Sequence, residues 1–239
     1  MAHDLAGGEH PDVARWRANG AAEAEAITSE SLRELMLECG ADDCGFVAVS
    51  DPAVADQQAW ISALLPNART LVSFVVRMNR DTVRTSVRSV ANEEFHQTYD
   101  DVNHVARKAV RKLEAMGFGA VNPAAAFPME AQAYPAGMRV ISHKPIAEAA
   151  GLGRMGLHRN VIHPRFGSFI LLGTIVIDRE IDVPSVPLDY APCLDCKLCV
   201  AACPVEAIGM DGSFNFSACY THNYREFMGG FVDWVHEVV

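Results

Sequence analysis

The sequence predicts an α+β domain followed by a short cysteine-rich segment. Runs with helical periodicity alternate irregularly with β-branched runs over the first three quarters of the chain. Half of the 239 residues are hydrophobic, which is ample for a packed core. Five of the seven cysteines fall between Cys193 and Cys219, after a proline-rich stretch. We therefore divide the chain into a flexible N-terminal segment 1–26, an α+β domain 27–182 and a cysteine segment 183–239.

Several stretches of the α+β domain have the pattern of helices. The first predicted helix begins at a capping box formed by Ser31 and Glu34 and ends at Gly40. Residues 52–65 predict a second helix with a proline in its first turn. The strongest pattern covers residues 92–116, where apolar side chains step by three and four along one face. A short helix is expected over residues 145–150.

Runs of β-branched and aromatic residues predict the strands. Residues 44–49 and 70–76 are expected to form the first two, and residues 119–121 and 138–142 predict short ones. Residues 169–177 are apolar at nearly every position, so this strand is expected to be buried on both faces.

One run in the cysteine segment carries metal chemistry. Its pattern is C-x2-C-x2-C-x3-C-P, formed by Cys193, Cys196, Cys199, Cys203 and Pro204. In bacterial ferredoxins this run holds an iron–sulfur cluster through thiolates, and the fourth cysteine usually serves a second cluster. The alternative is zinc, because C-x2-C pairs also bind zinc, although zinc sites usually combine two separated pairs or Cys with His. Cys219 is either a buried thiol or a ligand of the second cluster.

A glycine-rich segment precedes the last strand. It matches G-x-G-x-x-G at Gly151, Gly153 and Gly156. A dinucleotide-binding fingerprint needs a strand before it and a helix after it, and here a helix is predicted before it. The glycines are better explained by a turn or by a close approach of the backbone to a bulky group. Arg159 and Asn160, which follow, are candidates for contacting the polar edge of a ligand.

Charge and hydropathy limit the partners. The formal net charge is -10, which argues against a nucleic-acid partner. No apolar run is long enough to cross a membrane, and residues 1–19 do not have the pattern of a signal peptide. We therefore expect a cytoplasmic protein without a membrane partner.

Five stretches together resemble the epoxyqueuosine reductase family and its relatives, the reductive dehalogenases. They are LRELMLECGADDCGFVAVSDP, YDDVNHVARKAVRKLEAMGF, AEAAGLGRMGLHRNVIHPRFGSFILLGTIVID, the cysteine run and FSACYTHNY. The third is similar to the most specific segment of the family, whose glycine pattern here places Gly151, Gly153, Gly156, Asn160, Gly167 and Ser168.

The resemblance implies a nitroreductase-like mixed sheet flanked by helices, followed by a ferredoxin-like iron–sulfur segment. The α+β domain would bind cobalamin, with the glycine segment forming part of the corrinoid pocket. Arg159, a candidate from its position in that segment, is then expected to contact the same ligand. One or two [4Fe–4S] clusters would follow. Cys193, Cys196 and Cys199 would hold the first cluster, and Cys203 and Cys219 would belong to the second.

The activity implied by the resemblance is a reductive cleavage of an epoxide or carbon–halogen bond in a small-molecule substrate. Electrons would come from a redox partner of the ferredoxin or flavodoxin type and pass through the clusters. The family carries a proton-donating aspartate in a D-T-G-P stretch, whereas residues 136–145 of this chain contain no acidic residue. The acid is therefore unassigned, with Tyr99, Tyr134 and His143 as candidates.

Two non-catalytic alternatives remain open: a ferredoxin-like electron-transfer protein and a corrinoid-handling protein without substrate chemistry of its own. Five cysteines cannot fill two four-cysteine clusters. We therefore expect the native chain to continue beyond Val239 and to supply the remaining ligands.

Overall fold

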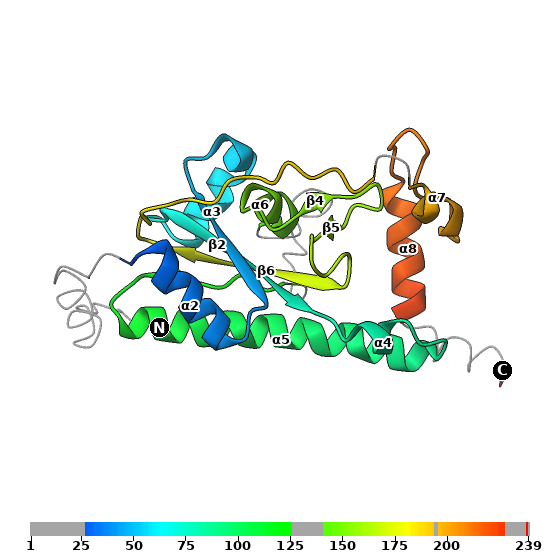
Figure 1. Cartoon of the computed structure of the whole chain (residues 1–239), viewed down its shortest axis with the longest axis horizontal. Coiled ribbons are helices and arrows are strands. Elements are labelled where there is room, and N and C mark those ends of the chain that lie inside the picture. The colour runs from blue at the N-terminus through cyan, green and yellow to red at the C-terminus, as the bar shows by residue number, and fades with distance from the viewer. Residues whose placement is uncertain (1–26, 126–140, 194–195, 228–237, 239) are drawn as a thin grey trace, which may run out of the picture.

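The computed structural model describes residues 27–125, 141–193, 196–227 and 238 (Figure 1). Its elements run in the order α2 (Ser29–Cys39), β1 (Asp43–Ala48), the 3-10 helix η1 (Pro52–Gln57), α3 (Gln58–Leu64), β2 (Thr70–Arg77), α4 (Arg80–Val83), α5 (Arg88–Ala115), β3 (Ala120–Val121), α6 (His143–Ala149), β4 (Arg154–Met155), β5 (Val161–Ile162), β6 (Ile170–Ile177), α7 (Leu198–Ala202) and α8 (Phe216–Phe227).

The central sheet has four strands in the order β1-β2-β6-β3. The α+β class is confirmed, with one difference from the expected mixed sheet: all three strand pairs of this sheet are antiparallel. The two long central strands pair over their full length, with Ser73 opposite Thr174. All of β2 except Arg77 is buried, and in β6 only Leu172 is partly exposed, which confirms the buried strand expected from residues 169–177.

Helices cover both faces of the sheet (Figure 1). On one face, Val72 and Phe74 of β2 pack in a core with α2 and α5. On the other face, Leu71 and Val75 pack with side chains of η1, α3 and α6. The alternation of neighbouring side chains between two cores follows from the two-residue period of a strand.

The long helix α5 spans one face of the sheet and is 28 residues long. Its predicted stripe is confirmed where it meets the sheet, because Val102, Ala106, Ala109 and Leu113 are buried. The helix begins earlier than the apolar pattern indicated. The added first turn carries no buried residue, so its sequence lacks the periodic signal used for the prediction.

Two helix predictions need correction. The N-cap of α2 is Thr28, whose hydroxyl accepts a hydrogen bond from the Ser31 backbone N–H and completes a box with the Ser31 side chain. Ser31 is therefore the third residue of the helix rather than its cap, because a serine can take either role. The helix predicted over residues 52–65 is divided into η1 and α3.

Two other predictions, the flexible segment 1–26 and the strand 138–142, fall wholly or partly outside the described residues. Residues 1–26 and 126–140 are among those that the structure does not describe. Of the strand predicted over residues 138–142, only Ile141 and Ser142 are described, and neither is in a strand.

The proline-rich stretch before the cysteines lies along the sheet. Ser185 exchanges hydrogen bonds with Phe46 of β1: its backbone N–H donates to the Phe46 carbonyl, and its hydroxyl accepts from the Phe46 N–H, at 2.8 and 2.9 Å. The chain then crosses the molecule to reach α7 (Figure 1). The proline-rich stretch is therefore anchored to the edge strand β1 through Ser185.

Candidate functional site

The glycine segment begins where α6 ends. Gly151 has a φ of 71°, the left-handed conformation that favours glycine, and a Cβ here would collide with the carbonyl of Val186. The chain then forms a two-stranded hairpin, β4–β5. The turn between these strands is closed by hydrogen bonds from the Gly156 N–H to the Asn160 carbonyl and from the Arg159 N–H to the Gly156 carbonyl. We refer to residues 151–162 as the glycine hairpin.

The hairpin explains why the glycine pattern is not a dinucleotide fingerprint. Such a fingerprint lies between a strand and a helix. Residues 141–177 are all described, and here the pattern follows helix α6 and leads into strand β5. The sequence prediction against NAD is therefore supported by the local structure.

Lys144 of α6 anchors the turn of the hairpin. Its Nζ donates to the Arg159 carbonyl at 2.6 Å and to Asn160 Oδ1 at 3.0 Å. Glu148, one turn further along α6, accepts a hydrogen bond from the Met155 N–H at 2.8 Å. Two polar side chains of helix α6 thus hold the turn and the β4 arm of the glycine hairpin.

A second turn, residues 163–167, continues from the hairpin toward β6. The backbones of His163 and Gly167 exchange hydrogen bonds, and Gly167 has a φ of 60°. The His163 ring is 3% exposed, stacks on Phe166 and lies 3.3 Å from Asp43 Oδ2 through Nε2. Since Nδ1 accepts from the Arg165 N–H, Nε2 is the nitrogen that donates to Asp43.

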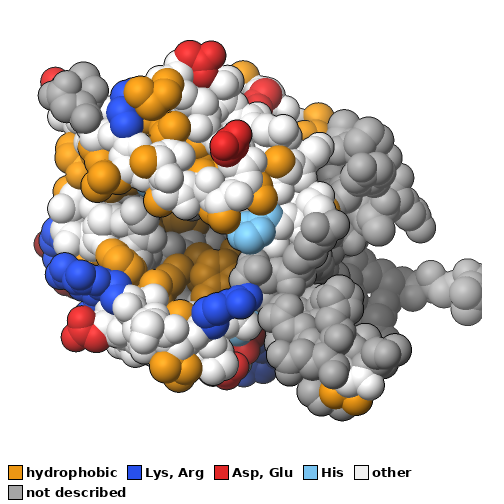
Figure 2. Space-filling model, turned by 90° about the vertical axis from the view of Figure 1, so that its right-hand side faces the viewer, with side chains coloured by type: hydrophobic (Ala, Val, Ile, Leu, Met, Phe, Trp, Pro, Cys, Tyr) orange, Lys and Arg blue, Asp and Glu red, His pale blue; other side chains and the backbone are white. Residues whose placement is uncertain are grey.

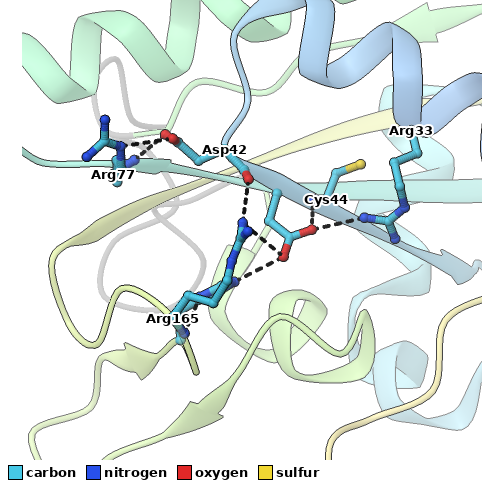
Figure 3. A network of polar contacts seen from close by, with 7 residues as sticks. Arg33, Asp42, Cys44, Arg77 and Arg165 are labelled. Carbon is cyan, nitrogen blue, oxygen red and sulfur yellow. Dashed lines mark hydrogen bonds and ion pairs between the residues drawn. The ribbon is translucent and has the colours of Figure 1, made fainter.

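Asp42 and Asp43, at the start of β1, form ion pairs with arginines from three other segments (Figure 3). Burial alone would raise the pKa of Asp43, but hydrogen bonds from His163 and the Cys44 N–H, together with the charge of Arg33, hold that pKa below its usual value. Arg165 donates to the Asp42 carbonyl, and Arg77 donates to the Asp42 carboxylate. This polar network ties the turn that carries Gly167 and Ser168 to the sheet.

Two of the three candidate proton donors can be placed. His143 is buried, with Nδ1 at 2.9 Å from Thr174 Oγ1 and Nε2 at 3.3 Å from the Ala124 carbonyl. Because a carbonyl only accepts, Nε2 donates in the contact with Ala124. His143 is thus held in the core between strand β6 and the segment that follows β3. Tyr99 packs against Phe95 on α5, and Tyr134 lies outside the described residues.

The five cysteines of the C-terminal segment are free thiols and lie at or near the surface. Cys203 Sγ accepts a hydrogen bond from the Ala207 N–H at 3.2 Å. Backbone N–H groups, led by that of Val205, lower the pKa of this thiol. Cys219 Sγ accepts from the Asn223 side chain at 3.6 Å. Cys39 and Cys44, by contrast, are buried in the α+β core, as expected for small apolar residues.

The donor chemistry of this segment fits an iron–sulfur cluster. Clusters are held by thiolates and tuned by hydrogen bonds to sulfur, and Cys203 has such a bond. Among the described residues, no three His, Cys, Asp or Glu side chains form a group able to hold a metal ion. The described part of the segment thus has the cysteine spacing and the free thiols that a cluster needs, but its described side chains are not gathered around one metal position.

The end of the molecule that carries α4, α7 and α8 is hollowed. Figure 2 shows a depression with hydrophobic side chains on its floor, and with Lys or Arg and a histidine at its rim. Two other concavities lie away from the glycine hairpin. One, of about 450 Å³, is lined by α4 and α5 residues, and one, of about 520 Å³, lies where β1 ends and β2 begins.

Sequence comparisons identify two groups of relatives, although no protein-family model matches the chain. The chain is 35% identical over 80 residues to epoxyqueuosine reductase of Staphylococcus aureus, covering 34% of this chain and 20% of that protein. It is 26% identical over 143 residues to tetrachloroethene reductive dehalogenase of Desulfitobacterium hafniense, covering 59% of this chain and 23% of that protein. The matches thus span about a fifth of each relative.

Solved structures of the same two groups share the fold. An epoxyqueuosine reductase bound to a tRNA stem loop superposes with a TM-score of 0.57, at 18% identity over 78% of this chain and 54% of that one. A reductive dehalogenase, whose structure is described as suggesting a B12-dependent mechanism, superposes with a TM-score of 0.66, at 16% identity over 84% of this chain and 30% of that one.

The described residues form an α+β fold, and the C-x2-C-x2-C-x3-C-P run follows its sheet in the chain. The chain is related to the epoxyqueuosine reductases and reductive dehalogenases, and the resemblance stated from the sequence is confirmed.

One expectation about partners is not supported. The net charge argued against nucleic acid, but a protein with this fold has been solved with a tRNA stem loop. Net charge sums over the whole surface and does not describe the local field at one face. Within the described residues, no helix is both long and apolar enough to cross a membrane.

No local motif marks the contacts that hold the site in place. Lys144 reaches Arg159 across 15 residues of sequence, and His163 reaches Asp43 across 120. The structure also shows the Arg159 side chain directed toward the cysteine segment.

Proposed function

We propose that the chain is part of a cobalamin- and iron–sulfur-dependent reductase that carries out a reductive cleavage. The observation that carries this proposal is the direct contact between the glycine hairpin and the cysteine segment. Arg159 Nη2 donates to the Gly212 carbonyl at 2.9 Å, so the two candidate cofactor sites are hydrogen-bonded neighbours. Short distances between cofactors are what electron delivery to a reaction centre requires.

The cysteine segment, residues 183–239 in our division, would hold the clusters. Cys193, Cys196 and Cys199 would bind the first, and Cys203 and Cys219 would contribute to a second. The clusters would supply one-electron transfer. In this role the Ala207 N–H would remain bonded to Cys203 Sγ and stabilise its thiolate form.

The α+β domain, residues 27–182, would bind the corrinoid. Its candidate contacts are the glycine hairpin and the following turn, including Gly151, Gly153, Gly156, Asn160, Gly167 and Ser168. Cobalamin supplies the reducing metal centre and the bond-breaking chemistry when bound. The apolar hollow of Figure 2 suits a large flat ring system. Lys144 and the Asp43–His163 pair would keep the glycine hairpin and the following turn rigid.

The substrate is proposed only as a class. Relatives act in epoxyqueuosine reduction and in reductive dehalogenation, and one neighbour was solved with a tRNA stem loop. A small molecule with an epoxide or carbon–halogen bond, free or attached to RNA, fits both groups. A ferredoxin or flavodoxin in the cytoplasm would supply the electrons.

Anaerobic reconstitution with iron and sulfide tests the cluster proposal. Iron and acid-labile sulfide should bind to the wild-type chain in nearly equal amounts. Cys199→Ser should lower both, whereas Cys39→Ser, which changes a buried cysteine of the core, should not. Zinc retained in place of iron, with no labile sulfide, would contradict the proposal.

Hydroxocobalamin titration of the reconstituted chain tests the corrinoid proposal. Binding should shift its visible spectrum, and Gly153→Val should weaken that binding because a side chain there meets the Ile162 backbone. Clusters without corrinoid binding would favour a ferredoxin-like electron carrier. Corrinoid binding without turnover of any epoxide or organohalide would favour a corrinoid-handling protein.

A further inference from the structure

Arg159 lies between the two parts of the candidate site. Its backbone belongs to the turn of the glycine hairpin, and its Nη2 donates to the Gly212 carbonyl at 2.9 Å. The guanidinium also stands over the ring of Phe214, 5.9 Å from its centroid. Gly212 and Phe214 belong to residues 207–215, which we call the cysteine-side turn. One side chain thus makes two different contacts across the two segments.

Contacts to the domain hold the backbone of Arg159 in place. Arg159 has a φ of 61°, which residues other than glycine rarely adopt. The turn holds it there through the bond from its N–H to the Gly156 carbonyl, and Lys144 Nζ binds its carbonyl at 2.6 Å. Because Lys144 belongs to helix α6, the position of Arg159 is set by the core.

The cysteine-side turn leads directly to two cysteines. Its two ends meet where the Asn215 N–H donates to the Ala207 carbonyl at 2.8 Å. The Ala207 N–H donates to Cys203 Sγ, and the Cys219 N–H donates to the Asn215 carbonyl. A displacement of this turn would therefore move the thiol of Cys203 and the start of helix α8.

Apolar packing does little to hold this part of the chain. Among the described residues from 191 to 223, only Ala207 is buried, at 2% exposure. The exposed hydrophobic side chains include Leu198 and Phe216, at 75% and 66%. Polar contacts to the domain consequently have a larger share in positioning the turn than they would have in a packed core.

We propose that Arg159 is a positioning residue that latches the cysteine-side turn, and with it Cys203 and Cys219, onto the glycine hairpin. The latch is a property of the chain itself. Its consequence for electron delivery, a fixed distance between cluster and corrinoid, rests on the proposed function.

Hydrogen–deuterium exchange of the full chain, read by mass spectrometry, tests the latch. Arg159→Gly removes the guanidinium and suits the left-handed backbone, so the hairpin turn itself should not be strained. Amides of residues 207–215 should exchange about tenfold faster, as expected from losing one charged hydrogen bond. Amides of β2 and β6 should keep their protection.

Matched variants separate the latch from general effects. Arg154→Ala removes another arginine of the same hairpin, one that faces Glu148, and should leave exchange of the cysteine-side turn unchanged. Arg159→Lys keeps a charged donor and should restore part of the protection. Phe214→Leu removes the aromatic face alone and should give a smaller increase than Arg159→Gly.

Two results would overturn the latch: unchanged exchange of residues 207–215 in Arg159→Gly, or faster exchange that extends equally through β2 and β6. Iron and sulfide binding by the wild-type chain is measured separately. If the clusters do not form while Arg159→Gly still loosens the turn, the proposed function fails and the latch stands. If they form while the turn is unaffected, the latch fails and the proposed function stands.

Discussion

The two parts of this molecule are held together in different ways. In the sheet, seven of the eight residues of β2 are buried, and two apolar cores cover the faces. In the cysteine segment, backbone hydrogen bonds close the turns, and among described residues from 191 to 223 only Ala207 is buried. The sheet and its helices are stabilised by the apolar side chains that they bury against each other. The cysteine segment has little apolar burial among its described residues, so hydrogen bonds have a larger share in its stability.

The largest expected difference between the two parts is in thiol reactivity. Burial raises the pKa of Cys44 to about 12, which lowers its thiolate fraction about a thousandfold relative to a free thiol of pKa 9.0. Cys196 is exposed. Iodoacetamide at pH 8 should therefore alkylate Cys196 rapidly and leave Cys44 unmodified in the native chain, as measured by peptide mass spectrometry. Urea should abolish the difference, and equal native rates would contradict the burial of Cys44.

Removing a large side chain should destabilise the core and not the cysteine segment. Phe74→Ala deletes a fully buried ring that fills the space above Gly173, and should lower the free energy of unfolding by about 3–5 kcal/mol. Phe216→Ala, which truncates an exposed ring on α8, should change it by less than about 0.5 kcal/mol. Urea denaturation of the cluster-free chain measures both. Similar losses would show that the cysteine segment is packed more tightly than its exposure indicates.

Removing a partly buried carboxylate of the domain should lower the free energy of unfolding more than removing an exposed one. Asp43→Asn replaces the carboxylate that binds the buried His163 and faces Arg33 with an uncharged amide, and should cost about 1–3 kcal/mol at neutral pH. The folded pKa of Asp43 is depressed, so its contribution is present above the unfolded pKa near 4 and is lost as pH falls through the lower folded pKa. In the variant, the decrease in stability between about pH 5 and pH 3 should therefore be shallower.

Glu38→Gln is the matched control for that pH dependence. Lys112 lowers the pKa of Glu38 through a hydrogen bond at 2.8 Å, but both side chains are exposed, and salt and solvent screen such pairs. Urea melts across pH 3–7 should show a smaller loss for Glu38→Gln than for Asp43→Asn. The reverse order would contradict a buried role for the Asp43–His163 pair.

Features that depend on neighbouring residues could be predicted from the sequence, whereas features that depend on contacts between distant residues could not. The buried strand at residues 170–177 and the stripe of α5 could be predicted because burial imposes a period on neighbouring residues. The cysteine run could be identified because ligand spacing is local. The antiparallel partner of each strand, and the contact of Arg159 with Gly212 across 53 residues of sequence, depend on tertiary packing and leave no local pattern.

The smallest expected change in stability concerns the first turn of α2, where the sequence is compatible with either Thr28 or Ser31 as the N-cap. The sequence favoured Ser31 as the cap, whereas Thr28 has the extended backbone of an N-cap, and its hydroxyl binds the Ser31 N–H. Thr28→Ala should cost about 1 kcal/mol, because it leaves that N–H without its partner. Ser31→Ala removes the exposed contacts of the Ser31 hydroxyl with Thr28, including the 3.2 Å bond from the Thr28 N–H, but keeps the Ser31 N–H bonded to Thr28 Oγ1, and should cost less. Thermal unfolding of the two variants decides between the caps, since a larger loss in Ser31→Ala would place the start of the helix at Ser31.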